Sequence, residues 1–280
     1  MFLGEFHGKN KFPPQSIAGF FFVITFAFSW FFWLFGVLAS LNLFSLPFPN
    51  MGVVVIGAHG PLVAALVLTY HSGGWKAVKK LLAAGFNLRL KLIWWLVILL
   101  LPVAVTGLVV WIAAALNGYQ PDLAMLSQPW MILPTFLFMF FLGGSFQEEF
   151  GWRGFALPRL LERWNPLIAS LILGGFWGVW HLPLFYITGT GQTFMPFGFF
   201  LLLAVAFSVL FTWIYLRTKR NLFSALLLHT AINTSLSIFP PIEQRIGGSQ
   251  VAFIYMTGLF LLAAIIVVIL DRFHFFRQAE

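Results

Sequence analysis

Long apolar stretches, separated by short segments with proline, glycine or asparagine, make up most of this 280-residue sequence. A helix that spans a membrane needs about 20 mostly apolar residues, and eight stretches approach or exceed that length. They are Ile17–Leu46, Gly52–Tyr70, Leu92–Leu116, Met131–Gly151 or somewhat beyond, Pro166–Ile187, Pro196–Leu216, Phe223–Ile238 and Gln250–Leu270. The pattern predicts an all-α integral membrane protein with eight transmembrane helices, folded as a single polytopic domain over residues 1–280.

The composition supports this prediction, because 60% of the residues are hydrophobic and only 9% are charged. Soluble proteins carry about 25% charged residues, so 16 Lys and Arg with eight Asp and Glu cannot cover a water-exposed surface of this size. The chain has no Cys, which excludes disulfides, thiolate nucleophiles and thiolate metal ligands. A soluble fold is therefore excluded, and the chemistry is left to oxygen and nitrogen side chains.

The basic residues occupy alternate loops, as they do in membrane proteins whose cytoplasmic loops carry the positive charge. Fifteen of the 16 fall on one side, and the exception is Arg245. The fifteen are Lys9, Lys11, Lys76, Lys79, Lys80, Arg89, Lys91, Arg153, Arg159, Arg163, Arg217, Lys219, Arg220, Arg272 and Arg277. We expect both termini in the cytoplasm of a prokaryotic cell, with the lipid bilayer as a partner. Because the charge is spread over several loops, the net charge of +8 does not indicate a nucleic-acid partner.

The segment Trp75–Ala84 (WKAVKKLLAA) is both basic and amphipathic. Helices of this kind lie in the membrane interface, with the apolar face towards the acyl chains and the lysines towards anionic headgroups. We therefore predict that this segment lies along the cytoplasmic surface of the membrane.

Two adjacent carboxylates differ from the other acidic residues in their position. Glu148 and Glu149 lie at the cytoplasmic end of the fourth apolar stretch, and Arg153 follows Glu149 by four residues, on the same helical face. The six others lie in loops or tails: Glu5, Asp122, Glu162, Glu243, Asp271 and Glu280. Charge inside a bilayer is costly, so an ionisable group there indicates a functional site. We expect Arg153 to form an ion pair with Glu149. A structural role for this pair is compatible with a place in a functional site.

Three histidines also lie within apolar stretches, namely His59, His181 and His229. Trp177 precedes His181 by four residues and Asn233 follows His229 by four, so each pair shares a helical face. A lone buried histidine is usually satisfied by a neighbouring polar group, and we interpret His59 as an interhelical hydrogen bond. The other two histidines, together with the only carboxylates in the spans, predict one site.

The depth of these residues in the membrane constrains the fourth helix. At 1.5 Å per residue, Glu148 and His181 reach the same depth only if the fourth helix continues to about Leu157, ahead of Pro158. We therefore predict a long fourth helix. Pro183, just after His181, permits a kink that opens the backbone at that point.

The chain reads EExxxR at Glu148–Arg153, WxxxH at Trp177–His181 and HxxxN at His229–Asn233. This set resembles the CPBP intramembrane protease family, which includes the CAAX prenyl endopeptidases and bacteriocin-processing proteins and is also called the Abi family. The second motif of the family has Phe where Trp177 stands, a departure that keeps an aromatic ring. The motif-bearing core covers about residues 131–240.

The resemblance implies an intramembrane endopeptidase that hydrolyses a peptide bond near the cytoplasmic face. Its catalytic residues would be Glu148, His181, His229 and Asn233. Its supporting residues would be Glu149, Arg153 and Trp177. Glu148 would be the base that activates water, and His181 would orient that water. His229 and Asn233 would donate hydrogen bonds to the oxyanion. The implied substrate is a membrane-associated or lipidated peptide, of the CAAX type or a bacteriocin precursor, and the implied mechanism needs no cofactor.

Two alternatives use the same residues. In the first, Glu148, His181 and His229 bind zinc with water as the fourth ligand; we favour the metal-free mechanism, because the chain has no HExxH motif. In the second, the protein is a transporter or a non-catalytic immunity or scaffold protein, and the site lines a proton or substrate path. Other intramembrane protease types fit less well, since the chain lacks a GxSG motif and has no Asp in any span.

Overall fold

The computed structural model describes residues 14–245 and 247–276, and these ranges contain helices and no strand. Within them, seven helical segments are long and apolar enough to cross a membrane, and α11 (Leu222–Ile238) is a shorter apolar helix of 17 residues. The protein is thus an all-helical, multi-pass membrane protein, as the sequence predicts, while the count of eight spans stays a prediction. Lys9, Lys11 and Arg277 lie outside the described residues.

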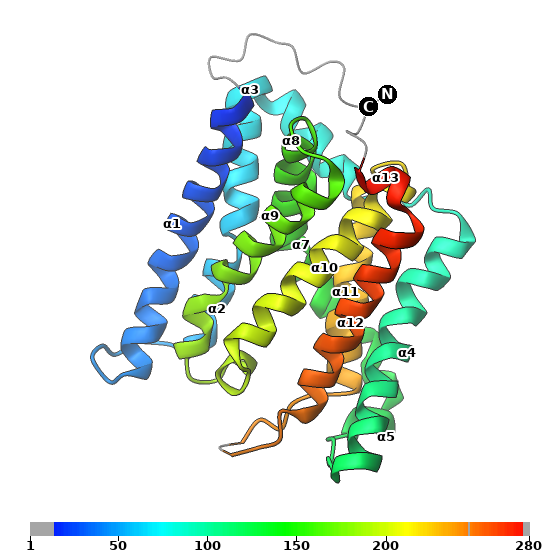
Figure 1. The fold of residues 1–280 in the computed structure, drawn as a ribbon. Coiled ribbons are helices and arrows are strands. Elements are labelled where there is room, and N and C mark those ends of the chain that lie inside the picture. The colour runs from blue at the N-terminus through cyan, green and yellow to red at the C-terminus, as the bar shows by residue number, and fades with distance from the viewer. Residues whose placement is uncertain (1–13, 246, 277–280) are drawn as a thin grey trace.

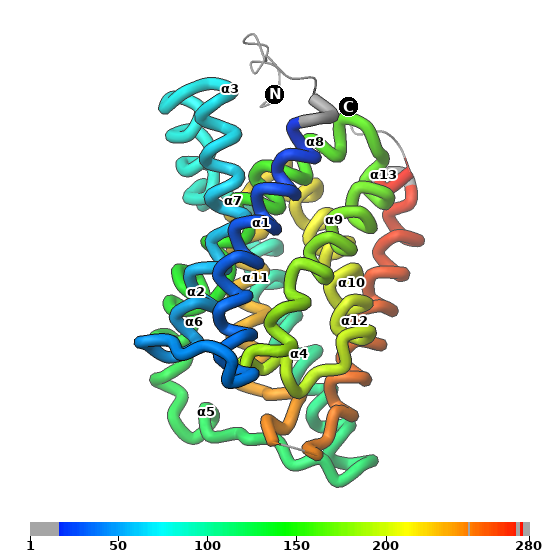
Figure 2. Tube along the Cα trace, turned by 90° about the vertical axis from the view of Figure 1, so that its left-hand side faces the viewer, coloured from blue at the N-terminus to red at the C-terminus, as the bar shows by residue number. Residues whose placement is uncertain are grey.

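The helices run side by side as a bundle (Figures 1 and 2). α1 (Pro14–Ser40) begins at the end where α8 (Leu157–Leu161) and α13 (Arg272–Phe276) lie, and α5 (Ala124–Ser127) lies at the opposite end. The other long helices are α4 (Leu92–Asn117), α9 (Pro166–Trp180), α10 (Phe197–Arg217) and α12 (Val251–Leu270). The first and last long helices therefore begin and end on the same side of the bundle, as an even number of crossings requires.

The second apolar stretch forms two helices, α2 (Asn50–Ala58) and α3 (Gly60–Ala84), with His59 at the break between them. Nδ1 of His59 donates a hydrogen bond to the carbonyl oxygen of Val55 at 2.8 Å. The prediction of an interhelical bond for this residue is therefore wrong, because the end of α2 leaves a carbonyl free one turn away.

The backbone of α3 is interrupted at Gly73 and Gly74, and Gly74 has a φ of 61° and a ψ of −163°. The basic segment that follows therefore changes direction at the upper end of the bundle (Figure 1). Trp75, its first residue, is 67% exposed. The basic segment thus forms a helical stretch of its own, and its position along the membrane surface stays a prediction.

Close packing between α9 and α10 depends on two glycines of α9. A β-carbon on Gly174 would lie 2.7 Å from the α-carbon of Val205, and one on Gly178 would lie 2.5 Å from Cδ1 of Leu201. These distances leave no room for a side chain, so the small residues let the two helices approach closely. The packing fixes α9, which carries Trp177 and His181, against the rest of the bundle.

α11 lies inside the bundle and is enclosed by α4, α6 (Ile132–Phe141), α7 (Ser145–Gly151) and α10. It starts at Asn221, whose side chain accepts a hydrogen bond from the backbone N–H of Phe223 at 3.0 Å. Most of its residues are buried on all sides, which is the pattern of a helix surrounded by protein. A helix surrounded by protein does not have to be as long as one that faces lipid, which accounts for the short length of α11. It holds His229 and Asn233 in the core.

The fourth apolar stretch is a broken helix. It extends beyond Gly151, as predicted, and it ends at Leu161 instead of at about Leu157. A π-helical turn, η2 (Trp152–Ala156), lets Pro158 sit in the first turn of α8, where no backbone N–H is required. A break after α6, at residues 142–144, separates α6 from α7. The prediction of one long helix therefore missed the break, which comes directly before the two carboxylates.

Candidate active site

Glu148 and Glu149 lie on the short helix α7, between the break at residues 142–144 and the π-helical turn. Both are buried, with exposed fractions of 6% and 0%. Adjacent residues on a helix point about 100° apart, so the two carboxylates enter different environments. Glu149 faces α11 and the π-helical turn, whereas Glu148 faces α9 and the break.

Glu149 holds two partners with one side chain. Nη1 of Arg153 donates to Oε1 and Oε2 of Glu149 at 2.9 and 3.1 Å, and Nδ1 of His229 donates to Oε1 at 2.8 Å. The guanidinium of Arg153 also lies over the rings of Trp177 and Phe211, with Cζ 4.6 and 4.2 Å from the ring centroids. The i,i+4 spacing correctly predicts the ion pair. In the buried core, each charge depends on the other for compensation.

The contact with Glu149 also fixes which ring nitrogen of His229 always carries a hydrogen. A carboxylate that is paired with arginine can only accept, so Nδ1 of His229 carries a hydrogen. Nε2 is then a hydrogen-bond acceptor when the ring is neutral and a donor only when the ring carries both protons. Glu149 thus orients the imidazole so that Nε2 points away from Glu149 and towards Gly144.

One carboxylate oxygen of Glu148 accepts a hydrogen bond from a side chain of the protein. The indole N–H of Trp177 donates to Oε2 at 2.6 Å. Oε1 faces the backbone break, where it lies close to Gly144. The carboxylate is thus held by one oxygen and leaves the other available.

His181 lies at the C-terminal end of α9, where the α-helix gives way to the 3₁₀ helix η3 (Leu182–Tyr186). The helix opens here, as the proline at 183 predicts. Nδ1 of His181 donates to the carbonyl oxygen of Trp177 at 2.7 Å, so Nε2 is free to accept a hydrogen bond from a ligand. The ring of Trp177 lies between the two imidazoles, with its centroid 5.9 Å from that of His181 and 5.8 Å from that of His229, so His181 lies beside the same site.

Three side-chain atoms surround the vacant side of Gly144. A β-carbon built on this glycine would lie 2.9 Å from Oε1 of Glu148, 3.3 Å from Nε2 of His229 and 3.6 Å from Nδ2 of Asn233. Nδ2 of Asn233 also donates to the carbonyl oxygen of Gly143 at 2.8 Å, which leaves its second hydrogen for another acceptor. A carboxylate oxygen, an imidazole nitrogen and a carboxamide nitrogen thus bound one small space.

The structure brings the predicted site residues together and keeps His59 apart, in its own turn at the α2–α3 break. Three further residues at the site have no role predicted from the sequence, namely Gly144, Gln147 and Phe211. Gln147 accepts a hydrogen bond from the backbone N–H of Gly144 through Oε1 at 3.0 Å, and Phe211 covers Arg153. The Gly143-Gly144 pair inside an apolar stretch was the available signal, since glycine pairs commonly interrupt helices.

The alternative zinc set of Glu148, His181 and His229 is not gathered as a group of ligands in this geometry. Within the described ranges, no group of three or more His, Asp or Glu side chains is placed to hold a metal ion. Oε2 of Glu148 is already the acceptor for Trp177. We therefore derive no step through a metal.

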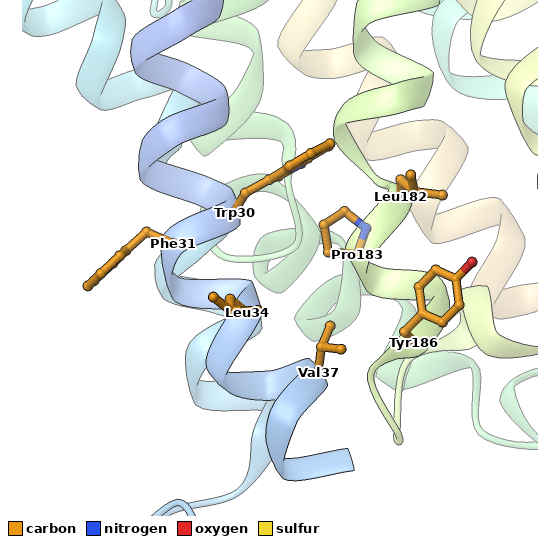
Figure 3. A pocket seen from close by; sticks show the side chains of 7 residues that line it. All are labelled: Trp30, Phe31, Leu34, Val37, Leu182, Pro183 and Tyr186. Atoms are coloured by element: carbon orange, nitrogen blue, oxygen red, sulfur yellow. The ribbon is translucent and has the colours of Figure 1, made fainter. Parts of the chain in front are cut away.

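A separate groove of about 450 Å³ lies between α1 and η3 (Figure 3). Its lining is largely apolar and consists of Trp30, Phe31, Leu34, Val37, Leu182, Pro183 and Tyr186. Trp30 crosses to α9 and donates its indole N–H to the carbonyl oxygen of Trp180 at 2.9 Å. The groove thus abuts the backbone next to His181, but it holds none of the site residues.

The fold and the site define a multi-pass membrane protein with a carboxylate, imidazole and carboxamide site inside its helix bundle. Residues 128–235 match the family model for the type II CAAX prenyl endopeptidases, Rce1-like. The chain is also 28% identical over 149 residues to a protein of Methanococcus maripaludis named CAAX prenyl protease 2. That match covers 51% of this chain and 52% of the relative, so it spans about half the length of each protein. Both findings support the CPBP family of CAAX proteases, which the three motifs indicated, and the family-model match contains every candidate site residue.

Proposed function

We propose that this protein is an intramembrane endopeptidase in which Glu148 activates the hydrolytic water. The family is one of peptide hydrolases, and the observation that carries the proposal is the convergence of Oε1 of Glu148, Nε2 of His229 and Nδ2 of Asn233 on one point beside Gly144. Peptide hydrolysis needs a base for the water and donors for the oxyanion. The three atoms supply both within the reach of a single peptide group.

The reaction follows from these positions. Oε1 of Glu148 takes a proton from water as the water oxygen attacks the carbonyl carbon of the peptide. Nε2 of His181 accepts a hydrogen bond from the second O–H of that water and so orients the water. The protonated Glu148 then gives its proton to the departing amide nitrogen, and the C–N bond breaks. One water is consumed, and a carboxylic acid and an amine are released.

The oxyanion is stabilised by donors on α11. Asn233 can donate through the hydrogen of Nδ2 that Gly143 does not use. His229 can donate through Nε2 only while its ring carries both protons, because Nδ1 already donates to Glu149. Glu149 and Arg153 therefore support the reaction by holding His229 in place and compensating its charge.

The proposed substrate is a membrane-anchored peptide with a lipidated tail. The relative from Methanococcus maripaludis carries the name CAAX prenyl protease 2, and a prenyl chain would keep the peptide in the bilayer beside the buried site. The positive-inside pattern supports an orientation in which the cytoplasmic end of the fourth apolar stretch lies nearest Glu148, and such a tail would enter from that side.

Cleavage by purified protein in detergent tests this proposal, with a farnesylated CAAX peptide as substrate and the same peptide without the lipid as comparison. We expect Glu148→Gln to abolish cleavage and the loop variant Glu243→Gln to leave it unchanged. Chelator should have no effect. Stoichiometric zinc with chelator-sensitive cleavage would replace the glutamate mechanism by the zinc alternative. Full activity of Glu148→Gln would overturn the site.

A further inference from the structure

Gly144 is held in a conformation that L-residues rarely adopt. Its φ is +112° and its ψ is −42°, and only glycine takes such positive φ values without strain. Both of its backbone groups are engaged, because the N–H donates to Oε1 of Gln147 at 3.0 Å and the carbonyl oxygen accepts from the N–H of Glu148 at 2.8 Å. The peptide groups are thus committed within α7, and the α-carbon is what Gly144 presents to the site.

Among the residues that the structure describes, the surroundings of Gly144 differ from those of the other glycines with positive φ. A β-carbon on Gly74, Gly118, Gly189 or Gly247 would meet nothing within 4 Å. On Gly144 it would meet the functional atoms of Glu148, His229 and Asn233, and the 2.9 Å distance to Oε1 of Glu148 is closer than real β-carbons come. The turn explains the need for glycine at all five positions, but it does not explain why three catalytic groups face this one.

We propose that the hydrolytic water rests against the α-carbon of Gly144 and that this residue is a glycine so that the water has room. The inference rests on the proposed function and adds a positioning residue to it. A water molecule in contact with the α-carbon would lie just beyond the β-carbon position, between Oε1 of Glu148 and Nε2 of His229. This is the resting position before a peptide binds; when the peptide carbonyl enters, Nε2 of His229 turns to the oxyanion, and His181 orients the water. A methyl group at that position would occupy the space and push Oε1 away.

The variant Gly144→Ala tests the proposal, with Gly189→Ala as the matched control. Gly189 has a φ of +97° and open space around it, so alanine there adds backbone strain without filling a site. We expect similar losses of thermal stability in the two variants. We expect kcat for the lipidated peptide to fall roughly 100-fold or more only in Gly144→Ala, since a shift of about 1 Å at a reacting group can cost that much. KM should change little, because the substrate still binds.

The outcomes separate this inference from the proposed function. An inactive Glu148→Gln together with a Gly144→Ala protein within threefold of wild-type kcat would overturn the inference and leave the function standing. Full activity of Glu148→Gln would overturn the proposed function, and the inference that rests on it would fall with it. A second measurement does not depend on the folding of Gly144→Ala: an experimental structure of Glu148→Gln should contain an ordered water between residue 148 and Nε2 of His229. A dry site there would also overturn the inference.

Discussion

The indole N–H of Trp177 donates a hydrogen bond to Oε2 of Glu148 at 2.6 Å, at the position where the family motif has phenylalanine. A phenylalanine ring would fill similar space without a donor. This chain therefore holds its proposed base with a contact that the family pattern does not require. The contact leaves Oε1 as the oxygen that faces His229 and Asn233.

Trp177→Phe should lower kcat roughly 10- to 100-fold with little change in KM. A hydrogen bond to a charged group contributes about 1.5–3 kcal/mol, and about 1.4 kcal/mol is a factor of ten. The control is Trp152→Phe, because Nε1 of Trp152 is buried and has no hydrogen-bond partner in the described part of the chain. Steady-state cleavage of the lipidated peptide measures the effect. Equal losses in both variants would show that ring size, not the hydrogen bond, matters.

Glu149→Gln and Arg153→Met should each lower the free energy of unfolding by about 3–5 kcal/mol, because each leaves the other charge buried without a partner. The double variant should regain much of that stability, since neither charge remains. It should stay inactive, because His229 has lost the carboxylate that orients it. Unfolding in detergent, measured beside cleavage, tests the pair. A double variant as unstable as the sum of the two single ones would argue against the ion pair.

Tyr119, in the loop after α4, is buried, and its hydroxyl donates to the carbonyl oxygen of Pro240 at 2.7 Å. Burial, together with the nearby charge of Glu243, raises the pKa of Tyr119 to about 12. The folded state thus favours the neutral phenol, and this contribution to stability is complete below the ordinary pKa of about 10. It should be lost as the pH rises from about 10 to 12. Melting temperatures across that range should drop less in Tyr119→Phe than in the parent protein.

Because the chain has no cysteine, a single introduced thiol can show which side of the membrane a given loop faces. Trp75→Cys and Arg245→Cys place it at exposed positions on segments that the positive-inside rule assigns to opposite sides. In intact cells, a membrane-impermeant maleimide should label the Arg245→Cys protein and should reach the Trp75→Cys protein only after permeabilisation. The reverse pattern would invert the topology.

Hydropathy and residue spacing were sufficient to predict most of the helices and the local pairs of the site. Glu149 and Arg153 could be paired from sequence because i,i+4 geometry is a local property of a helix. The contact between Glu149 and His229 joins residues 80 positions apart, and no periodicity encodes it. The choice of Glu149 as the partner of His229, and of Trp177 as the partner of Glu148, became visible only in three dimensions.

The broken fourth helix shows the same limit. Its residues are apolar on both sides of Gly143-Gly144, so hydropathy indicates one continuous span. The break depends on the backbone of Gly144 and on its bond to Gln147, and the π-helical turn directly precedes the turn of α8 that contains Pro158. Local sequence gives weak signals for both.

The burial of α11 bears on how the proposed site is assembled in the cell. Glu148 and His181 are synthesised before His229 and Asn233, and the latter two enter the core only when α11 docks among α4, α6, α7 and α10. A nascent or truncated chain that lacks α11 would hold the proposed base without the proposed oxyanion donors and would leave Glu149 without His229. The site would then be complete only after the last part of the bundle has inserted, so a partly inserted chain should be inactive.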